Sequence, residues 1–235
     1  MPRPKRIALE GFIYHVVNRG NNRQPVFKDK DDFLVFLRVL KKFKDKYAFK
    51  LYAFCLMNNH YHLILEPTQP RTLSKIIQSV TLSYLRLHHK KYAASGHLWQ
   101  GRFKSPVIDK DEYLLECLRY VELNPVRAKM VKHPKDYAFS SYAFHGLGKD
   151  PRGLLDDDAM YLSLGKSGQE RQEAYRKFLS GEQDEAVVRQ IRNSIQAGLA
   201  LASDHFMAGL RQRVHMARPR PRGRPRKKEN TESGA

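Results

Sequence analysis

The sequence lacks the features that mark secreted and membrane proteins. Among its 235 residues there are only two cysteines, Cys55 and Cys117, too few for a disulfide framework and compatible with a reducing cytoplasm. No apolar run approaches the roughly 18 residues that a transmembrane helix needs. The basic N-terminus is not followed by an apolar stretch of signal-peptide length. We therefore expect a cytoplasmic protein with no membrane partner.

Acidic residues are also scarce. The chain has 24 Asp and Glu against 43 Lys and Arg, a formal net charge of +19. Such an excess favours a polyanionic partner, chiefly nucleic acid. The alternative is a basic protein without such a partner. No segment forms a basic amphipathic helix with aromatic anchors, which disfavours a membrane surface.

The pattern of apolar residues predicts an α+β fold. β-branched and aromatic residues dominate the first of four predicted strands, at 7–19, and the other three are predicted at 50–57, 60–66 and about 103–108. Apolar residues recur at helical spacing in three predicted helices, at 31 to about 47, about 72 to 90 and 111 to near 124. The order β-α-β-β-α-β-α matches the ferredoxin-like split βαβ pattern, an antiparallel sheet with helices on one face.

Composition divides the chain into three parts. We expect the sheet domain at 1–145 and a loop and helical extension at 146–212, with helices at about 168–180 and 184–212. Residues 213–235 are expected to form a basic tail, which is rich in proline and should be disordered when alone.

Two histidines are candidate metal ligands. His60 and His62 are separated by one residue in a predicted strand, so their side chains point to the same face and Tyr61 points to the other. Two imidazoles on one face can ligate one metal ion. The same pattern also arises when strand histidines face solvent or make other hydrogen bonds, so the pair alone is a weak signal.

A tyrosine in the third predicted helix is a candidate nucleophile. Tyr120 and Asn124 are four residues apart, which places a phenol and an amide on one helix face. A free tyrosine has a pKa near 10, and a nearby cation would stabilise its phenolate. The alternative is an ordinary half-buried tyrosine.

Four ordered segments together resemble the HUH tyrosine transposases, in particular the group that includes the REP-associated tyrosine transposases. The segments are 15–20, 55–65, 96–104 and 120–128, and the resemblance covers about residues 7–145. It implies that His60 and His62 are metal ligands, that Tyr120 is the catalytic tyrosine and that Asn124 is a third ligand. Asn58 departs from the family pattern, because many relatives have proline there.

The resemblance also implies a mechanism. Single-stranded DNA beside a hairpin would be cut by Tyr120 with the help of Mg²⁺ or Mn²⁺, leaving a 5′-phosphotyrosine and a free 3′-hydroxyl. A second 3′-hydroxyl could reverse the step and join a new strand. The location would be bacterial cytoplasm, with the protein associated with the nucleoid. Insertion-sequence relatives act as dimers and REP-associated ones alone, so a homodimer and a monomer both stay open.

Two regions are candidate DNA contacts, because single strands are held by positive grooves and aromatic stacking. The candidates in the sheet domain are Arg19, Asn21, Arg23, Trp99, Gln100, Arg102 and Lys104. The alternatives are that the first three only form a turn and that Trp99 packs its loop onto the core. In the tail, Arg222 and Arg224 flank Gly223 in an AT-hook-like motif that suits a narrow minor groove. Generic polyelectrolyte binding is the alternative there.

Three other functions compete with a strand transferase. The runner-up is a catalytically inactive DNA-binding or regulatory protein of the same fold. A metal-dependent hydrolase of small phosphoesters would need no tyrosine nucleophile. An architectural minor-groove protein would depend on the tail alone.

Overall fold

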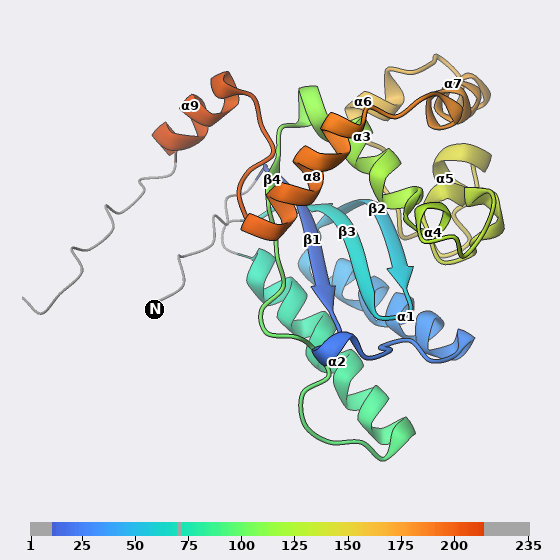
Figure 1. Cartoon of the computed structure of the whole chain (residues 1–235), viewed down its shortest axis with the longest axis vertical. Coiled ribbons are helices and arrows are strands. Elements are labelled where there is room, and N and C mark those ends of the chain that lie inside the picture. Colours follow the sequence, from blue (N-terminus) through green and yellow to red (C-terminus); the bar gives the residue numbers. More distant parts are fainter. Residues whose placement is uncertain (1–10, 70–71, 214–235) are drawn as a thin grey trace, which may run out of the picture.

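A computed structural model describes residues 11–69 and 72–213, with side chains described to residue 210 (Figure 1). Arg222 and Arg224 of the AT-hook-like motif lie outside the described residues, as does the start of the first predicted strand. Within the described part, no helix has both the length and the apolar character that a bilayer crossing requires.

The described strands form one antiparallel sheet in the order β2-β3-β1-β4. The strands are β1 (Ile13–Arg19), β2 (Lys50–Met57), β3 (His60–Glu66) and β4 (Val107–Ile108). Asn58 and Asn59 make the tight turn between β2 and β3, as predicted. The central pair, β1 and β3, places Arg19 opposite His60 and Val17 opposite His62.

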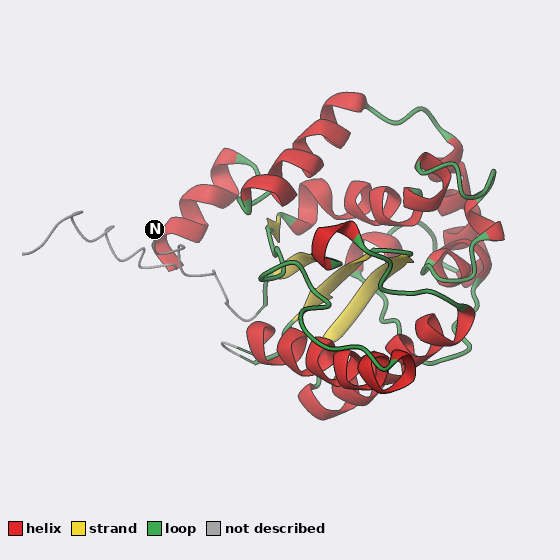
Figure 2. Cartoon of the chain, turned by 60° about the horizontal axis from the view of Figure 1, so that its bottom comes forward, coloured by secondary structure: helices red, strands yellow, loops and turns green. Residues whose placement is uncertain are grey.

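Helices α1 (Lys30–Tyr47) and α2 (Leu73–Tyr92) cover one face of the sheet (Figure 2). Their apolar stripes meet Tyr14 and Val16 of β1 and Leu63 of β3 in one buried cluster. The predicted fold, a ferredoxin-like antiparallel sheet with packed helices plus a C-terminal helical extension, is confirmed, and α1 and α2 are the helices that share this face.

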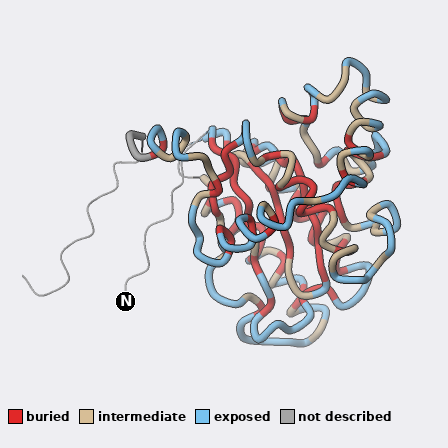
Figure 3. Tube along the Cα trace, turned by 45° about the horizontal axis from the view of Figure 1, so that its top comes forward, coloured by how far each residue is buried: buried red, intermediate tan, exposed pale blue. Residues whose placement is uncertain are grey.

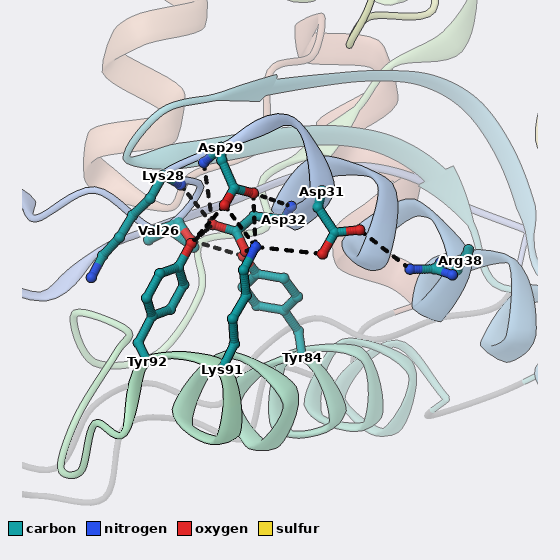
Figure 4. A network of polar contacts seen from close by, with 9 residues as sticks. All are labelled: Val26, Lys28, Asp29, Asp31, Asp32, Arg38, Tyr84, Lys91 and Tyr92. Carbon is teal, nitrogen blue, oxygen red and sulfur yellow. Dashed lines mark hydrogen bonds and ion pairs between the residues drawn. The ribbon is translucent and has the colours of Figure 1, made fainter.

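A polar network joins the start of α1 to the end of α2 (Figure 4). Asp29 caps α1 by accepting from the Asp32 backbone N–H at 3.0 Å, and Asp32 returns the bond in a capping box. The Lys91 ammonium lies 2.8 Å from Asp29 and 2.9 Å from Asp32, while the Tyr92 hydroxyl donates to Asp32 at 2.7 Å. These contacts hold the start of α1 against the end of α2.

The second face is covered by α3 (Lys110–Glu122) and by the extension (Figures 1 and 2). A second buried cluster joins Cys55 and Ile64 of the sheet to Leu118 of α3 and Ile191 of α8. The other helices, in chain order, are η1 (Asn21–Arg23), α4 (Asn124–Arg127), η2 (Pro134–Asp136), α5 (Tyr142–Leu147), α6 (Ala159–Leu162), α7 (Gly168–Ser180), α8 (Glu185–Ala197) and α9 (Asp204–Arg213). Both faces of the sheet are therefore buried (Figure 3).

Several element boundaries differ from the sequence predictions, and β1 begins at Ile13 although residues 11 and 12 were also expected in it. The helix predicted at 184–212 is two helices, because Gly198 ends α8 in the left-handed conformation at φ 70°. Leu199, which falls within the predicted helix, follows this end and is 66% exposed. The last strand is shorter than 103–108, since Pro106 has no N–H to donate to a ladder. The third helix ends at Glu122, and Asn124 starts the separate short helix α4 with Pro125 in its first turn. The helix predicted at 168–180 is confirmed as α7.

Candidate active site on the second face of the sheet

The β3 strand presents two histidines to the face covered by α3. His60 and His62 share this face with Ile64, whereas Tyr61 and Leu63 point into the cluster under α1 and α2. The centroids of the two imidazole rings are 5.1 Å apart. The predicted strand alternation is confirmed, and it gives the pair a common direction.

A third histidine, His15, joins this pair from the neighbouring strand β1. Its Nε2 lies 2.8 Å from Nδ1 of His62, and both rings are buried. Since two imidazole nitrogens share one proton in such a bond, one ring donates and the other accepts. The bond therefore fixes the orientation of the His62 ring and couples the protonation of the two rings.

The orientation of His60 is set by the turn before it. Its Nδ1 lies 2.6 Å from Oδ1 of Asn59, whose own amide nitrogen donates to the Arg23 carbonyl at 3.1 Å. Because the Asn59 oxygen can only accept, Nδ1 of His60 carries the proton. Its Nε2 is then an unprotonated nitrogen with a lone pair, the form that binds metals.

Tyr120 of α3 lies directly over the histidines. Its ring centroid is 6.0 Å from that of His15 and 6.0 Å from that of His62. The residue is 7% exposed and belongs to the buried cluster between α3 and the sheet. The structure thus brings the predicted nucleophile to the predicted metal ligands.

Asn124 follows one turn after Tyr120. Its side-chain nitrogen donates to the carbonyls of Tyr120 at 2.9 Å and Val121 at 3.2 Å, so its side-chain oxygen is the atom left for a ligand role. Among the described residues, no three or more His, Cys, Asp or Glu side chains gather as a metal site. An amide oxygen is a possible third ligand beside His60 and His62. Asn124 as a metal ligand stays a prediction.

Burial keeps the histidines neutral. It lowers the pKa of His15 to about 3, and burial together with the positive charge of Arg19 lowers the pKa of His60 to about 4. The pKa of His62 is held well below 6.5 by burial and by the charges of its histidine neighbours and Arg127. Since metals bind neutral imidazole, the cluster is in its ligand form at neutral pH.

The candidate DNA contacts of the sheet domain lie along one end of β1, next to His60. The Arg19 side chain donates from Nε to Gln100 at 2.9 Å, and the Asn21 backbone N–H donates to the Leu98 carbonyl at 2.8 Å. Lys104 pairs with Val17 of β1 through two backbone bonds. Arg19, Arg23, Gln100, Arg102 and Lys104 are exposed. Two segments about 80 positions apart in the sequence thus lie together at this end of β1. We call their exposed residues the basic border: Arg19, Arg23, Gln100, Arg102 and Lys104.

Trp99 is half-buried against the α2 side of the core. Its ring lies 5.5 Å from Tyr61 and 6.1 Å from Tyr84, and its Nε1 donates to the Thr81 carbonyl at 3.3 Å. The structure therefore shows the alternative given above, in which Trp99 packs its loop onto the core. A contact between Trp99 and a DNA base stays a prediction.

Sequence reasoning assigned no role to three residues that meet at the site. His15 could have been found from the alternation of β1, since it shares a face with Val17 and Arg19. Arg127 follows Tyr120 by seven residues, on the separate helix α4, and its guanidinium carbon lies 4.4 Å from the centre of the Tyr120 ring. Gln183, whose side chain accepts from Arg127 at 2.8 Å, comes from the extension and had no local signal.

Comparisons with known proteins show what the chain is similar to. The family model described as "Transposase IS200 like" matches residues 8–124. A Haemophilus influenzae protein described as a REP-associated tyrosine transposase is 28% identical in an alignment of 118 residues that covers 46% of this chain and 66% of that protein. The match thus spans just under two thirds of this relative's length.

One solved structure supports the fold. It is described as a REP-associated tyrosine transposase bound to a REP hairpin, and it superposes with a TM-score of 0.54 at 19% sequence identity. The match covers 68% of this chain and 96% of that chain. At this identity the likeness shows a shared fold.

Proposed function

We propose that the protein nicks single-stranded DNA and transfers the cut strand through a tyrosine, a proposal supported by the match of residues 8–124 to the family model of IS200-like transposases. The reaction serves DNA transposition or the processing of repetitive palindromes. One observation carries the proposal: the Tyr120 ring lies 6.0 Å from the ring of His62, on the face that His60 also shares.

The metal in this proposal is Mg²⁺ or Mn²⁺, held by Nε2 of His60, Nε2 of His62 and the side-chain oxygen of Asn124. The donor set fits, because Nδ1 of each histidine already has a partner and Nε2 is the remaining nitrogen. Mixed imidazole and oxygen ligands suit Mn²⁺ and are tolerated by Mg²⁺. When bound, the cation supplies positive charge beside the scissile phosphate.

The chemical step belongs to Tyr120. Its phenolic oxygen attacks the phosphorus, the P–Oη bond forms as the P–O3′ bond breaks, the phenol loses its proton and the departing 3′-oxygen gains one. The product is a 5′-phosphotyrosine and a free 3′-hydroxyl. Because the ester bond keeps the energy of the phosphodiester, a second 3′-hydroxyl can reverse the step without ATP.

The DNA partner is a single strand that carries a hairpin. The basic border of Arg19, Arg23, Gln100, Arg102 and Lys104 lies beside His60, where it can hold phosphates next to Tyr120. A similarly folded transposase is described as bound to a REP hairpin, which supports the choice of probe. The net charge of +19 supports a polyanionic partner in general.

Covalent capture of DNA tests the proposal. Single strands with hairpins from the DNA flanking the gene are labelled at the 3′ end, because the 3′ fragment keeps the phosphate that joins tyrosine. We expect a labelled protein adduct with Mn²⁺, none with EDTA, and none with Tyr120→Phe. Tyr113→Phe, seven residues earlier on α3, is the matched control and should form the adduct.

Two results would exclude the proposal. An adduct with Tyr120→Phe would show that another residue is the nucleophile. Tight DNA binding with no adduct from the wild-type protein, on any hairpin strand and with either metal, would favour the inactive regulatory protein instead.

A further inference from the structure

Arg127 holds the nucleophilic tyrosine at two points. It is the last residue of α4, its guanidinium carbon lies 4.4 Å from the centre of the Tyr120 ring, and its Nη2 donates to the Tyr120 carbonyl. The rings of His15 and His62 approach Tyr120 at interplanar angles of 70° and 76°. The Tyr120 ring therefore has an edge-on pair of histidines and a cation over its face.

The position of Arg127 depends in turn on the extension. Its Nη1 donates to Oε1 of Gln183 at 2.8 Å, and Gln183 lies between α7 and α8. The amide nitrogen of Gln183 donates to Glu116 of α3 at 3.3 Å, which fixes which end of the amide faces Arg127. Gln183 thus bridges the helix that carries the nucleophile and the arginine that contacts it.

We propose that Arg127 is a positioning residue for Tyr120 and that Gln183 lets the C-terminal extension control this position. The inference rests on the proposed function, since it concerns the orientation of the same nucleophile. A planar guanidinium can stack on an aromatic face while it donates in its own plane to two oxygens, and a lysine ammonium cannot. Arg127 is the residue type that this double contact requires.

The physical effect is on the rate of the chemical step. Attack on phosphorus needs the phenolic oxygen at a defined place, and a displacement of about 1 Å can cost on the order of 100-fold in rate. Arg127 is half-buried, and this strengthens its contact with the Tyr120 ring, because a cation that is less screened by water interacts more strongly with an aromatic face. DNA affinity arises largely from the exposed basic border and should depend little on Arg127.

The chain offers a matched control one residue from the nucleophile. Arg119 also docks on the extension: it donates to the Gly181 carbonyl, and its guanidinium lies 4.9 Å from the centre of the Phe178 ring. It is buried and pairs with Glu116 at 3.7 Å. Arg119 therefore shares the neighbourhood, the residue type and the docking role of Arg127, and its ring partner is Phe178 instead of Tyr120.

The experiment compares Arg127→Lys, Gln183→Leu and Arg119→Lys in the full chain. The rate of covalent capture is measured at saturating hairpin DNA with Mn²⁺, and the Kd for DNA is measured with EDTA so that no cutting occurs. We expect Arg127→Lys to lower the rate by about 10- to 100-fold with Kd within about 3-fold. Gln183→Leu should lower the rate by about 3- to 10-fold, and Arg119→Lys should stay within about 3-fold. Free guanidinium should restore part of the rate to Arg127→Ala and none to Arg119→Ala.

The outcomes separate this inference from the proposed function. If Arg127→Lys captures DNA at the wild-type rate, or if Arg127→Lys and Arg119→Lys lose rate equally, the positioning role is overturned and the proposed function is left intact. No capture by the wild-type protein would overturn the proposed function and this inference with it.

Discussion

Nε2 of His15 and Nδ1 of His62 lie 2.8 Å apart between neighbouring strands, and both rings are buried. Histidines that ligate metals characteristically donate their second N–H to a neighbouring acceptor, which fixes the tautomer and the ring orientation. If His62 donates to His15, its Nε2 is free for the metal. In the proposed metal site, His15 on β1 would then orient His62 on β3.

Replacing His15 should weaken metal binding without removing a ligand. His15→Phe keeps the volume of the ring and removes the acceptor, so the Kd for Mn²⁺ should rise by about 10- to 100-fold. His15→Gln can still accept a hydrogen bond, so its Kd for Mn²⁺ should lie between those of His15→Phe and the wild type. Calorimetry or Mn²⁺ electron paramagnetic resonance measures the affinity. An unchanged Kd in His15→Phe would show that the bond has no part in metal binding.

The metal-free protein should lose stability as the pH falls below about 6.5. Burial holds the pKa of His15 at about 3 and that of His60 at about 4, below the unfolded value, so the unfolded chain binds protons that the folded chain refuses. Each such histidine contributes a slope of at most about 1.4 kcal/mol per pH unit, and stability rises with pH across this range. Urea unfolding in EDTA between pH 6.5 and 5, above most carboxyl titrations, measures the slope. His15→Phe should make it shallower, and a flat wild-type profile would contradict the expectation.

Glu122 should be the carboxylate on which the stability of the second face depends most. It is fully buried on α3, and it accepts from His145 at 2.7 Å, from Tyr175 at 2.9 Å and from the Ser141 hydroxyl. Glu122→Leu leaves these buried groups without an acceptor and should lower the free energy of unfolding by about 3–5 kcal/mol.

Glu122→Gln keeps one acceptor oxygen and should cost about 1–3 kcal/mol. Glu116→Gln, on the same helix but partly exposed, is the control and should cost less than about 1 kcal/mol. Urea denaturation measures all three variants. A loss in Glu122→Leu no larger than that of the control would show that the network does not stabilise the extension on α3.

Arg19 should contribute to DNA affinity through phosphate contact. It is exposed beside His60 and pairs with Gln100, so Arg19→Gln should weaken binding of all hairpin strands alike and lower the salt dependence of log K by about 1. Arg38→Gln is the matched control, because Arg38 is exposed on α1, the helix that covers the opposite face. Fluorescence anisotropy between 50 and 200 mM salt (about the usual range for such slopes) measures both. Equal effects of the two variants would remove the basic border from the binding site.

Local patterns were sufficient for most of the fold. Periodicity predicted α1, α2 and α7 to within one or two residues, because their apolar stripes and end signals agree. Two predicted boundaries were wrong because a single residue outweighed the apolar pattern around it. Gly198 ended a helix whose apolar spacing continued, and Pro106 shortened a strand rich in strand formers.

The sequence by itself determined the facing of His60 and His62, since side chains in a strand must alternate, and it determined where Tyr120 sits on its helix. It could not determine what these residues meet. His15 reaches His62 through strand register, and Gln183 reaches Arg127 across 56 positions of the chain. Contacts of this kind depend on how the two helical layers pack on the sheet, and packing is decided by the shape of the whole core and not by any single segment.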